Sequence, residues 1–236
     1  MCAYHYARWT ENTLLRVQYD SSKNRMTQMA LLRRLAATPL GIFDIVMTTI
    51  VLLCVVAIFV AVILNFAGSN TQHVRKERRS IVETGTMTAF FLVYYLCARF
   101  QVGALPPPPV ALHISIACLS LVVIVGGTLV NIWGRVALGH NWANQIKMYE
   151  NQTFIHSGPY SFVRHPLYAS LVWMFFAGSF LYFNWLLFLL TVVIFLPFMT
   201  WRARQEEMLL EEQFPGYSKY RKITGMFFPK LLRFHL

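Results

Sequence analysis

Charged residues are scarce in this chain, and acidic residues are the scarcest. Only 13% of the 236 residues are charged, against about 25% in an ordinary soluble domain, and 10 Asp and Glu residues stand against 21 Lys and Arg residues. Hydrophobic residues make up 56% of the chain, which excludes intrinsic disorder because a disordered chain has low hydrophobicity. The apolar residues form long blocks, so the composition predicts an integral membrane protein instead of a soluble enzyme.

Several familiar signatures are also missing. The sequence has no GxGxxG motif, Walker loop, HExxH or GxSxG, so a cofactor pocket here would have to form without a Rossmann sheet. The four cysteines lie far apart without metal-binding spacing, and we expect no metal site. The net charge of +11 invites a nucleic-acid interpretation. The basic residues flank apolar blocks, however, which favours contact with anionic lipid and argues against a nucleic-acid partner.

Five apolar blocks predict five transmembrane helices, because a spanning helix needs about 20 mainly apolar residues. The last two blocks are separated only by Asn184, so we expect a tight helical hairpin. Each of these two is short for a span, and we expect thinning or a kink near Pro197. We therefore predict an all-α integral membrane protein. The five blocks cover residues 45–66, 84–105, 110–133, 167–183 and 185–201.

Polar segments divide the chain into three predicted regions. Residues 1–41 form a polar, basic tail, residues 42–133 form three transmembrane helices, and residues 134–236 form a catalytic region. Basic residues gather after the first and third blocks and in the C-terminal tail, which the positive-inside rule places on the cytosolic face. Five spans would then put the N-terminus on the other face. This conflicts with the same rule, because the N-terminal tail itself has six Lys and Arg residues. Either the tail overrides the rule or one segment is re-entrant.

Two polar clusters flank the predicted hairpin. Pro166 fits the first turn of a helix, so His165 would lie at the positive end of that helix, a place suited to an anion. No acidic residue lies between Glu150 and Glu206. Four glutamates then follow from Glu206 to Glu212, within one predicted short helix. Each cluster alone is also explained by contact with water or lipid headgroups. A tight hairpin brings them together, which predicts one pocket at the cytosolic membrane surface.

The combined pattern GPYxxxRHPxY, two apolar spans, RxRxEExxLxxxF and YxxY resembles the isoprenylcysteine carboxyl methyltransferase family. The similarity covers about residues 131–220. The RHPxY element alone also occurs in related phospholipid methyltransferases, so it indicates the superfamily better than the substrate. The matching residues are Gly158, Pro159, Tyr160, Arg164, His165, Pro166, Leu167, Tyr168, Arg202, Arg204, Glu206, Glu207, Leu210, Phe214, Tyr217 and Tyr220.

The resemblance implies a site for S-adenosylmethionine and a prenylated substrate. Arg202 matches a residue placed at the substrate and is the candidate catalytic residue. Glu206 matches the carboxylate that holds the cofactor. The other implied cofactor contacts are Gln145, Gln152, Thr153, Phe154, Ile155, Tyr160, His165, Pro166, Leu167 and Tyr168.

The implied reaction transfers a methyl group to the C-terminal carboxylate of a prenylated cysteine. A carboxylate is already ionised at neutral pH, so the site needs in-line positioning and no general base. Arg202 would clamp that carboxylate, because Arg presents paired donors. Glu206 would pair with the cofactor's ammonium group, and His165 would receive the cofactor's carboxylate. Arg164 is left open between the cofactor's carboxylate and a lipid headgroup.

Two other function classes stay open from the sequence. A membrane methyltransferase for another acceptor, such as a phospholipid amine, would share the cofactor pocket. A non-enzymatic membrane scaffold with the same fold would bind no S-adenosylmethionine. For a eukaryotic chain the resemblance implies the endoplasmic reticulum membrane, with the active site facing the cytosol and a role in processing prenylated proteins; a prokaryotic chain would use its plasma membrane.

Overall fold

A computed structural model describes residues 39–69, 74–78, 81–139, 146–149 and 154–230. The chain divides into two compact units, residues 1–50 and 51–236. The first contributes only the beginning of one helix to the described residues. In chain order the elements are α2 (Pro39–Ser69), β1 (Val74–Arg78), α3 (Ile81–Arg99), α4 (Val110–Leu138), β2 (Ile146–Tyr149), η2 (Gly158–Ser161), α5 (Pro166–Leu181), α6 (Trp185–Leu190), η3 (Thr191–Phe195), α7 (Leu196–Gln213) and α8 (Tyr217–Ile223).

Helices dominate the described residues, which confirms the predicted helical class. Within the described residues, three helical segments are long and apolar enough to cross a membrane: Gly41–Asn65, Val110–Leu138 and Trp185–Gln213. The apolar helix α5 is shorter. Together with α3, it occupies the other two predicted blocks, so the count of five membrane crossings stays a prediction, as does the three-region division. The structure adds one feature that the all-α prediction lacked, because β1 and β2 pair antiparallel.

The predicted hairpin is present, and Asn184 builds its turn. The Asn184 side-chain oxygen accepts hydrogen bonds from the backbone N–H groups of Leu186 (3.0 Å) and Leu187 (3.1 Å), which caps α6. Its Nδ2 donates to the Val102 carbonyl at 2.9 Å. Gly103, with φ +81°, lies so close that a Cβ there would be 2.5 Å from Leu186 Cβ. The turn between α5 and α6 and the connection between α3 and α4 are therefore held together.

The expected irregularity near Pro197 is a π-helical turn, η3. Proline has no N–H and its ring clashes with the carbonyl four residues earlier. The chain widens just before it, and the Leu196 N–H donates to the Thr191 carbonyl five residues back. Helices α6 and α7 thereby remain one continuous span, Trp185–Gln213.

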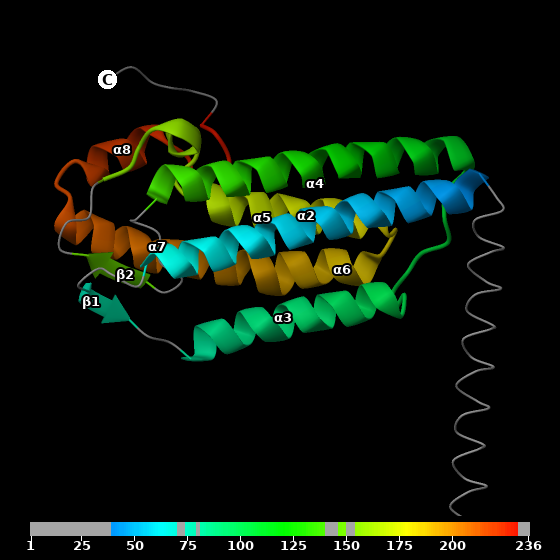
Figure 1. Ribbon diagram of the computed structural model, residues 1–236, viewed down its shortest axis with the longest axis horizontal. Coiled ribbons are helices and arrows are strands. Elements are labelled where there is room, and N and C mark those ends of the chain that lie inside the picture. The colour runs from blue at the N-terminus through cyan, green and yellow to red at the C-terminus, as the bar shows by residue number, and fades with distance from the viewer. Residues whose placement is uncertain (1–38, 70–73, 79–80, 140–145, 150–153, 231–236) are drawn as a thin grey trace, which may run out of the picture. The chain divides into compact units, whose positions relative to one another are not determined.

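Aromatic packing and small residues hold the helices of the second unit together. Phe90 of α3 stacks on Phe195 at a centroid distance of 4.6 Å, and Phe175 of α5 packs edge-on against Phe195 at 4.7 Å. Helices α4 and α5 lie side by side (Figure 1). A Cβ on Gly127 would lie 2.6 Å from Met174 Cγ, and one on Gly134 would lie 3.0 Å from Leu167 Cδ2. Small residues thus allow α4 to approach α5 closely.

The polar segments of the second unit gather at the opposite end from the α5–α6 turn. There β1 pairs with β2, β2 contacts α7, η2 contacts α4 and α8 contacts α7. This is the grouping of basic segments that the positive-inside argument predicts. The cytosolic orientation of this end stays a prediction.

Candidate functional site

The site is built around the start of α5, which begins where the sequence predicts. Pro166 occupies the first turn and His165 is the N-cap residue. The preceding backbone is tied to the C-terminal segment, because the Arg164 N–H donates to the Gly225 carbonyl at 2.8 Å and the His165 N–H donates to the Met226 carbonyl at 3.2 Å. Two stretches that are about 60 residues apart in sequence therefore fix the backbone of this loop.

His165 is buried between two glutamates of α7. Its Nδ1 lies 3.4 Å from Glu206 Oε2, and its Nε2 lies 3.1 Å from Glu207 Oε1. Burial opposes protonation, but the hydrogen bonds and negative charges of both glutamates outweigh it and raise the pKa of His165. Since both ring nitrogens face carboxylates, the imidazolium form satisfies both contacts. This geometry favours a positioning role for His165 over direct contact with a third carboxylate.

Tyr168 connects Glu206 to Arg202. Its hydroxyl donates to Glu206 Oε1, and the Arg202 guanidinium lies over the Tyr168 ring. The Tyr168 ring lies nearly parallel to the His165 ring, at a centroid distance of 5.6 Å, and the Arg202 Cζ lies 5.9 Å from the Tyr168 ring centroid. Arg202 is buried, whereas the Glu206 side chain is 29% exposed. Four predicted site residues thus meet, with one carboxylate open to a ligand.

Glu207 is a site residue that the functional assignment from sequence missed. Its carboxylate is almost fully buried, and Oε1 lies 2.8 Å from Arg164 Nε while Oε2 lies 3.5 Å from Arg221 Nε. Adjacent residues on a helix point about 100° apart, so Glu206 faces the site and Glu207 faces the loop and α8. The adjacent glutamates in the sequence were the signal that could have identified Glu207. Their separate roles depend on which neighbours the two faces of α7 meet, and the sequence does not show this.

The structure shows Arg164 bonded to groups of the protein itself. It pairs with Glu207, and its Nη1 donates to the backbone carbonyls of Arg221 (3.1 Å) and Thr224. Its side chain is 8% exposed. Arg164 therefore joins the loop before α5 to α7 and α8 and does not face lipid headgroups.

Tyr160 and Phe154 form the aromatic side of the site. Tyr160 is buried, and its backbone carbonyl accepts a 2.5 Å hydrogen bond from the Tyr220 hydroxyl. Burial raises the pKa of the Tyr160 hydroxyl well above its usual value, with Glu206 adding to the effect and Arg135 opposing it. Phe154 packs edge-on against Tyr220 at 5.2 Å. Of the other predicted cofactor contacts, Ile155 is half-buried. Three more lie outside the described residues: Gln145, Gln152 and Thr153.

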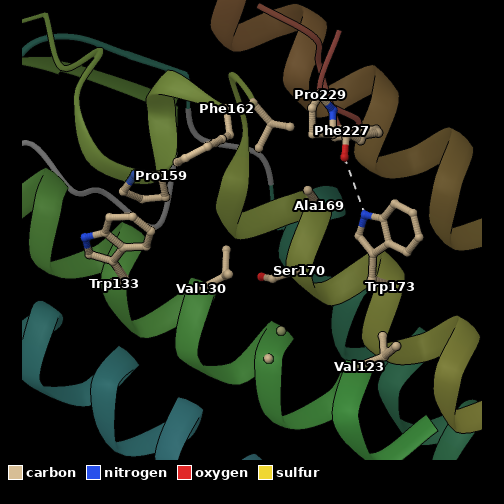
Figure 2. A pocket seen from close by; sticks show the side chains of 13 residues that line it. Val123, Val130, Trp133, Pro159, Phe162, Ala169, Ser170, Trp173, Phe227 and Pro229 are labelled. Atoms are coloured by element: carbon tan, nitrogen blue, oxygen red, sulfur yellow. Dashed lines mark hydrogen bonds between the residues drawn. The ribbon is translucent and has the colours of Figure 1, made fainter. Parts of the chain in front are cut away.

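An apolar groove of about 490 Å³ lies along α4 and α5 (Figure 2). Trp173 on α5 donates its indole N–H to the Phe227 carbonyl at 3.4 Å, which attaches the C-terminal segment to the groove (Figure 2). Ser170, which also lines it, donates to the Leu167 carbonyl at 2.9 Å. The lining residues are Val123, Gly126, Gly127, Val130, Trp133, Pro159, Phe162, Val163, Ala169, Ser170, Trp173, Phe227 and Pro229.

Comparison with known proteins finds a family that part of the chain resembles. Residues 118–212 match the model of the isoprenylcysteine carboxyl methyltransferase (ICMT) family. The matched range runs from α4 through most of α7, and it contains His165, Tyr168, Arg202 and Glu206. Comparison with curated proteins finds no match. Together with the apolar helices, the match indicates an integral membrane protein in which residues 118–212 are similar to the isoprenylcysteine carboxyl methyltransferase family.

Proposed function

We propose that this protein methylates the C-terminal carboxylate of a prenylated cysteine, using S-adenosylmethionine. The observation that carries the proposal is the pairing of two opposite charges one helical turn apart on α7. Arg202 is a buried cation, Glu206 is a partly exposed anion, and Tyr168 contacts both. A cationic cofactor and an anionic acceptor need this combination of charges in one place.

The chain's own groups would hold the two reactants in line. Glu206 would bind the ammonium group of the cofactor, and Arg202 would orient the acceptor carboxylate with two parallel N–H groups. His165 contacts the Glu206 side chain and so fixes the orientation of the Glu206 carboxylate. When bound, the cofactor supplies a methyl group that is activated by a positively charged sulfur. The acceptor is already ionised, so the protein supplies position and charge without moving a proton.

The membrane setting fits a substrate that has a charged end and a lipid tail. The tail would reach the site laterally from the bilayer, between apolar helices, while the cofactor would arrive from water. We propose that the polar end of the second unit faces the cytosol. In a eukaryote this places the protein in the endoplasmic reticulum membrane, in the processing of prenylated proteins. The basic segments near this end support that orientation.

Purified protein with labelled S-adenosylmethionine tests the proposal. The acceptor panel is farnesylcysteine, geranylgeranylcysteine and phosphatidylethanolamine. We expect base-labile label on a prenylcysteine, because a methyl ester forms. Label on phosphatidylethanolamine instead would support a phospholipid methyltransferase, and absence of cofactor binding would support a scaffold.

Two substitutions connect this activity to the site. Arg202→Ala and Glu206→Gln are each expected to lower kcat/KM by at least about 100-fold, because each removes a charged hydrogen-bonding partner of a reactant. Glu212→Gln is the matched control, since Glu212 is an exposed residue of the same helix, and it should keep near-normal turnover. Normal turnover in both site variants would overturn the assignment of the site.

A further inference from the structure

A second buried arginine borders the same site from another helix. Arg135 lies near the end of α4 and is 8% exposed. Its Nε donates to Asn131 Oδ1 at 2.9 Å. Asn131 is fully buried, and its Nδ2 donates to the Leu167 carbonyl (3.2 Å) and to Ser170 Oγ (2.8 Å). The amide of Asn131 therefore holds Arg135 against the first turn of α5.

The neighbours of Arg135 include residues of the proposed site. Its charge interacts with Tyr160 and Tyr168, both implied cofactor contacts. The preceding residue, Gly134, packs on Leu167, and its carbonyl lies 3.5 Å from the Tyr160 hydroxyl. Tyr168 thus interacts with Arg135 of α4 and with Arg202 of α7. The site therefore has two buried guanidinium groups, supplied by two helices.

The charges of the proposed reactants match this arrangement. The cofactor carries an ammonium, a sulfonium and a carboxylate, and the acceptor carries a second carboxylate. Glu206 suits the positive groups, but a single Arg202 cannot hold both carboxylates. His165 is unsuited to the second one, because Glu206 and Glu207 already face its ring nitrogens and would repel another anion. A planar guanidinium beside the N-terminus of a helix suits a carboxylate.

The geometry points to Arg135 as a second anion-binding residue: we propose that it binds the methionyl carboxylate of the cofactor, while Arg202 binds the carboxylate of the acceptor. The proposal rests on the proposed function and extends it, because it assigns one arginine to each carboxylate. Asn131 is then a positioning residue for Arg135.

A pair of ligands that differ only in this carboxylate tests the assignment. S-adenosylhomocysteine and its decarboxylated analogue are titrated against the full-length protein, Arg135→Met and Arg135→Lys. We expect the wild type to prefer the carboxylated ligand by about 10- to 100-fold, as for one hydrogen-bonded charge pair. Arg135→Met should lose the preference, and Arg135→Lys should keep part of it through its remaining point charge. An unchanged preference in Arg135→Met would overturn the proposal.

Matched variants separate this proposal from its premise. Arg202→Met should keep the ligand preference and lose turnover of the prenylcysteine, whereas Arg135→Met should raise KM for the cofactor more than KM for the acceptor. Arg99→Met is the control for removing an arginine from an apolar helix, since Arg99 is exposed at the end of α3. If Arg135→Met does not fold, Arg135→Lys decides, and full retention of the preference there contradicts bidentate binding. If the wild type binds neither ligand, the proposed function itself fails.

Discussion

Helix α5 carries two contrasting surfaces. Tyr168 points toward the charged groups of α7, whereas Ser170, about 200° away around the helix, lines the apolar groove beside α4. The charged side depends on paired groups from α7 and the loop before α5, and the apolar side depends on shape. The C-terminal segment serves both, because Gly225 accepts from the Arg164 N–H and Phe227 lines the groove. One short helix therefore separates a cluster of charged side chains on one side from an apolar groove on the other.

The largest effect is expected from a change in the segment that serves both surfaces. A Cβ on Gly225 would lie 1.8 Å from the Phe228 carbonyl oxygen, so Gly225→Ala must displace backbone. We expect a loss of about 3 kcal/mol or more, seen as a melting temperature lower by about 6 °C or more in detergent, together with weaker cofactor binding. Gly216→Ala is the control, because nothing lies within 4 Å of its Cβ position. Equal melting temperatures for the two variants would show that the segment does not hold the site.

A change confined to the charged surface should have the next largest effect. Glu207→Gln removes the negative charge that Arg164, His165 and Arg221 share. Breaking a buried ion pair typically costs about 3 to 5 kcal/mol, and we expect a loss near the lower end because the amide still accepts hydrogen bonds. Denaturant unfolding measures the loss against Glu212→Gln, an exposed change on the same helix. A difference below about 0.5 kcal/mol between the two variants would contradict a structural role for this carboxylate.

The pH dependence of stability should show the charge on His165. Its pKa is raised in the folded protein, so its contribution is fully present below the unfolded value of about 6.5 and is lost as the pH rises through the folded value. At mildly acidic pH we expect the wild type to have a higher melting temperature than His165→Gln. The difference in melting temperature should narrow as the pH becomes alkaline. Thermal unfolding across that range measures the difference. A difference that widened with pH would mean that His165 is neutral in the fold.

Local signals in the sequence predicted part of this architecture. Pro166 marked the start of α5, Asn184 marked the hairpin turn and Pro197 marked the irregular turn, because each acts on backbone within a few residues. The pairing of β1 with β2 was missed, since their residues are about 70 positions apart and the strands have only five and four residues. Long-range pairing of this kind has no local signature.

The charged site was predicted only in outline for the same reason. The motif brought His165 and Glu206 together, but it did not separate the roles of the two adjacent glutamates. Arg135 follows the third predicted apolar block, where the sequence indicates only a basic segment, and its place in the site depends on which face of α4 meets α5. The contact of Asn131 with Ser170 sets that face, and a sequence alone does not contain the relative rotation of two helices.

The smallest predicted effect is on the apolar surface, where two adjacent glycines of α4 face different surroundings. A Cβ on Gly126 meets nothing within 4 Å, whereas a Cβ on Gly127 would lie 2.6 Å from Met174 Cγ. Gly126→Ala should stabilise the protein by about 0.5 to 1 kcal/mol, because alanine restricts the unfolded chain and favours helix. Gly127→Ala should lose that gain by forcing Met174 aside. Denaturant unfolding compares the two, and cofactor affinity should stay unchanged in Gly126→Ala. Equal stabilisation by both would mean that α4 and α5 are not closely packed at Gly127, and a fall in cofactor affinity would show that the two surfaces of α5 are coupled.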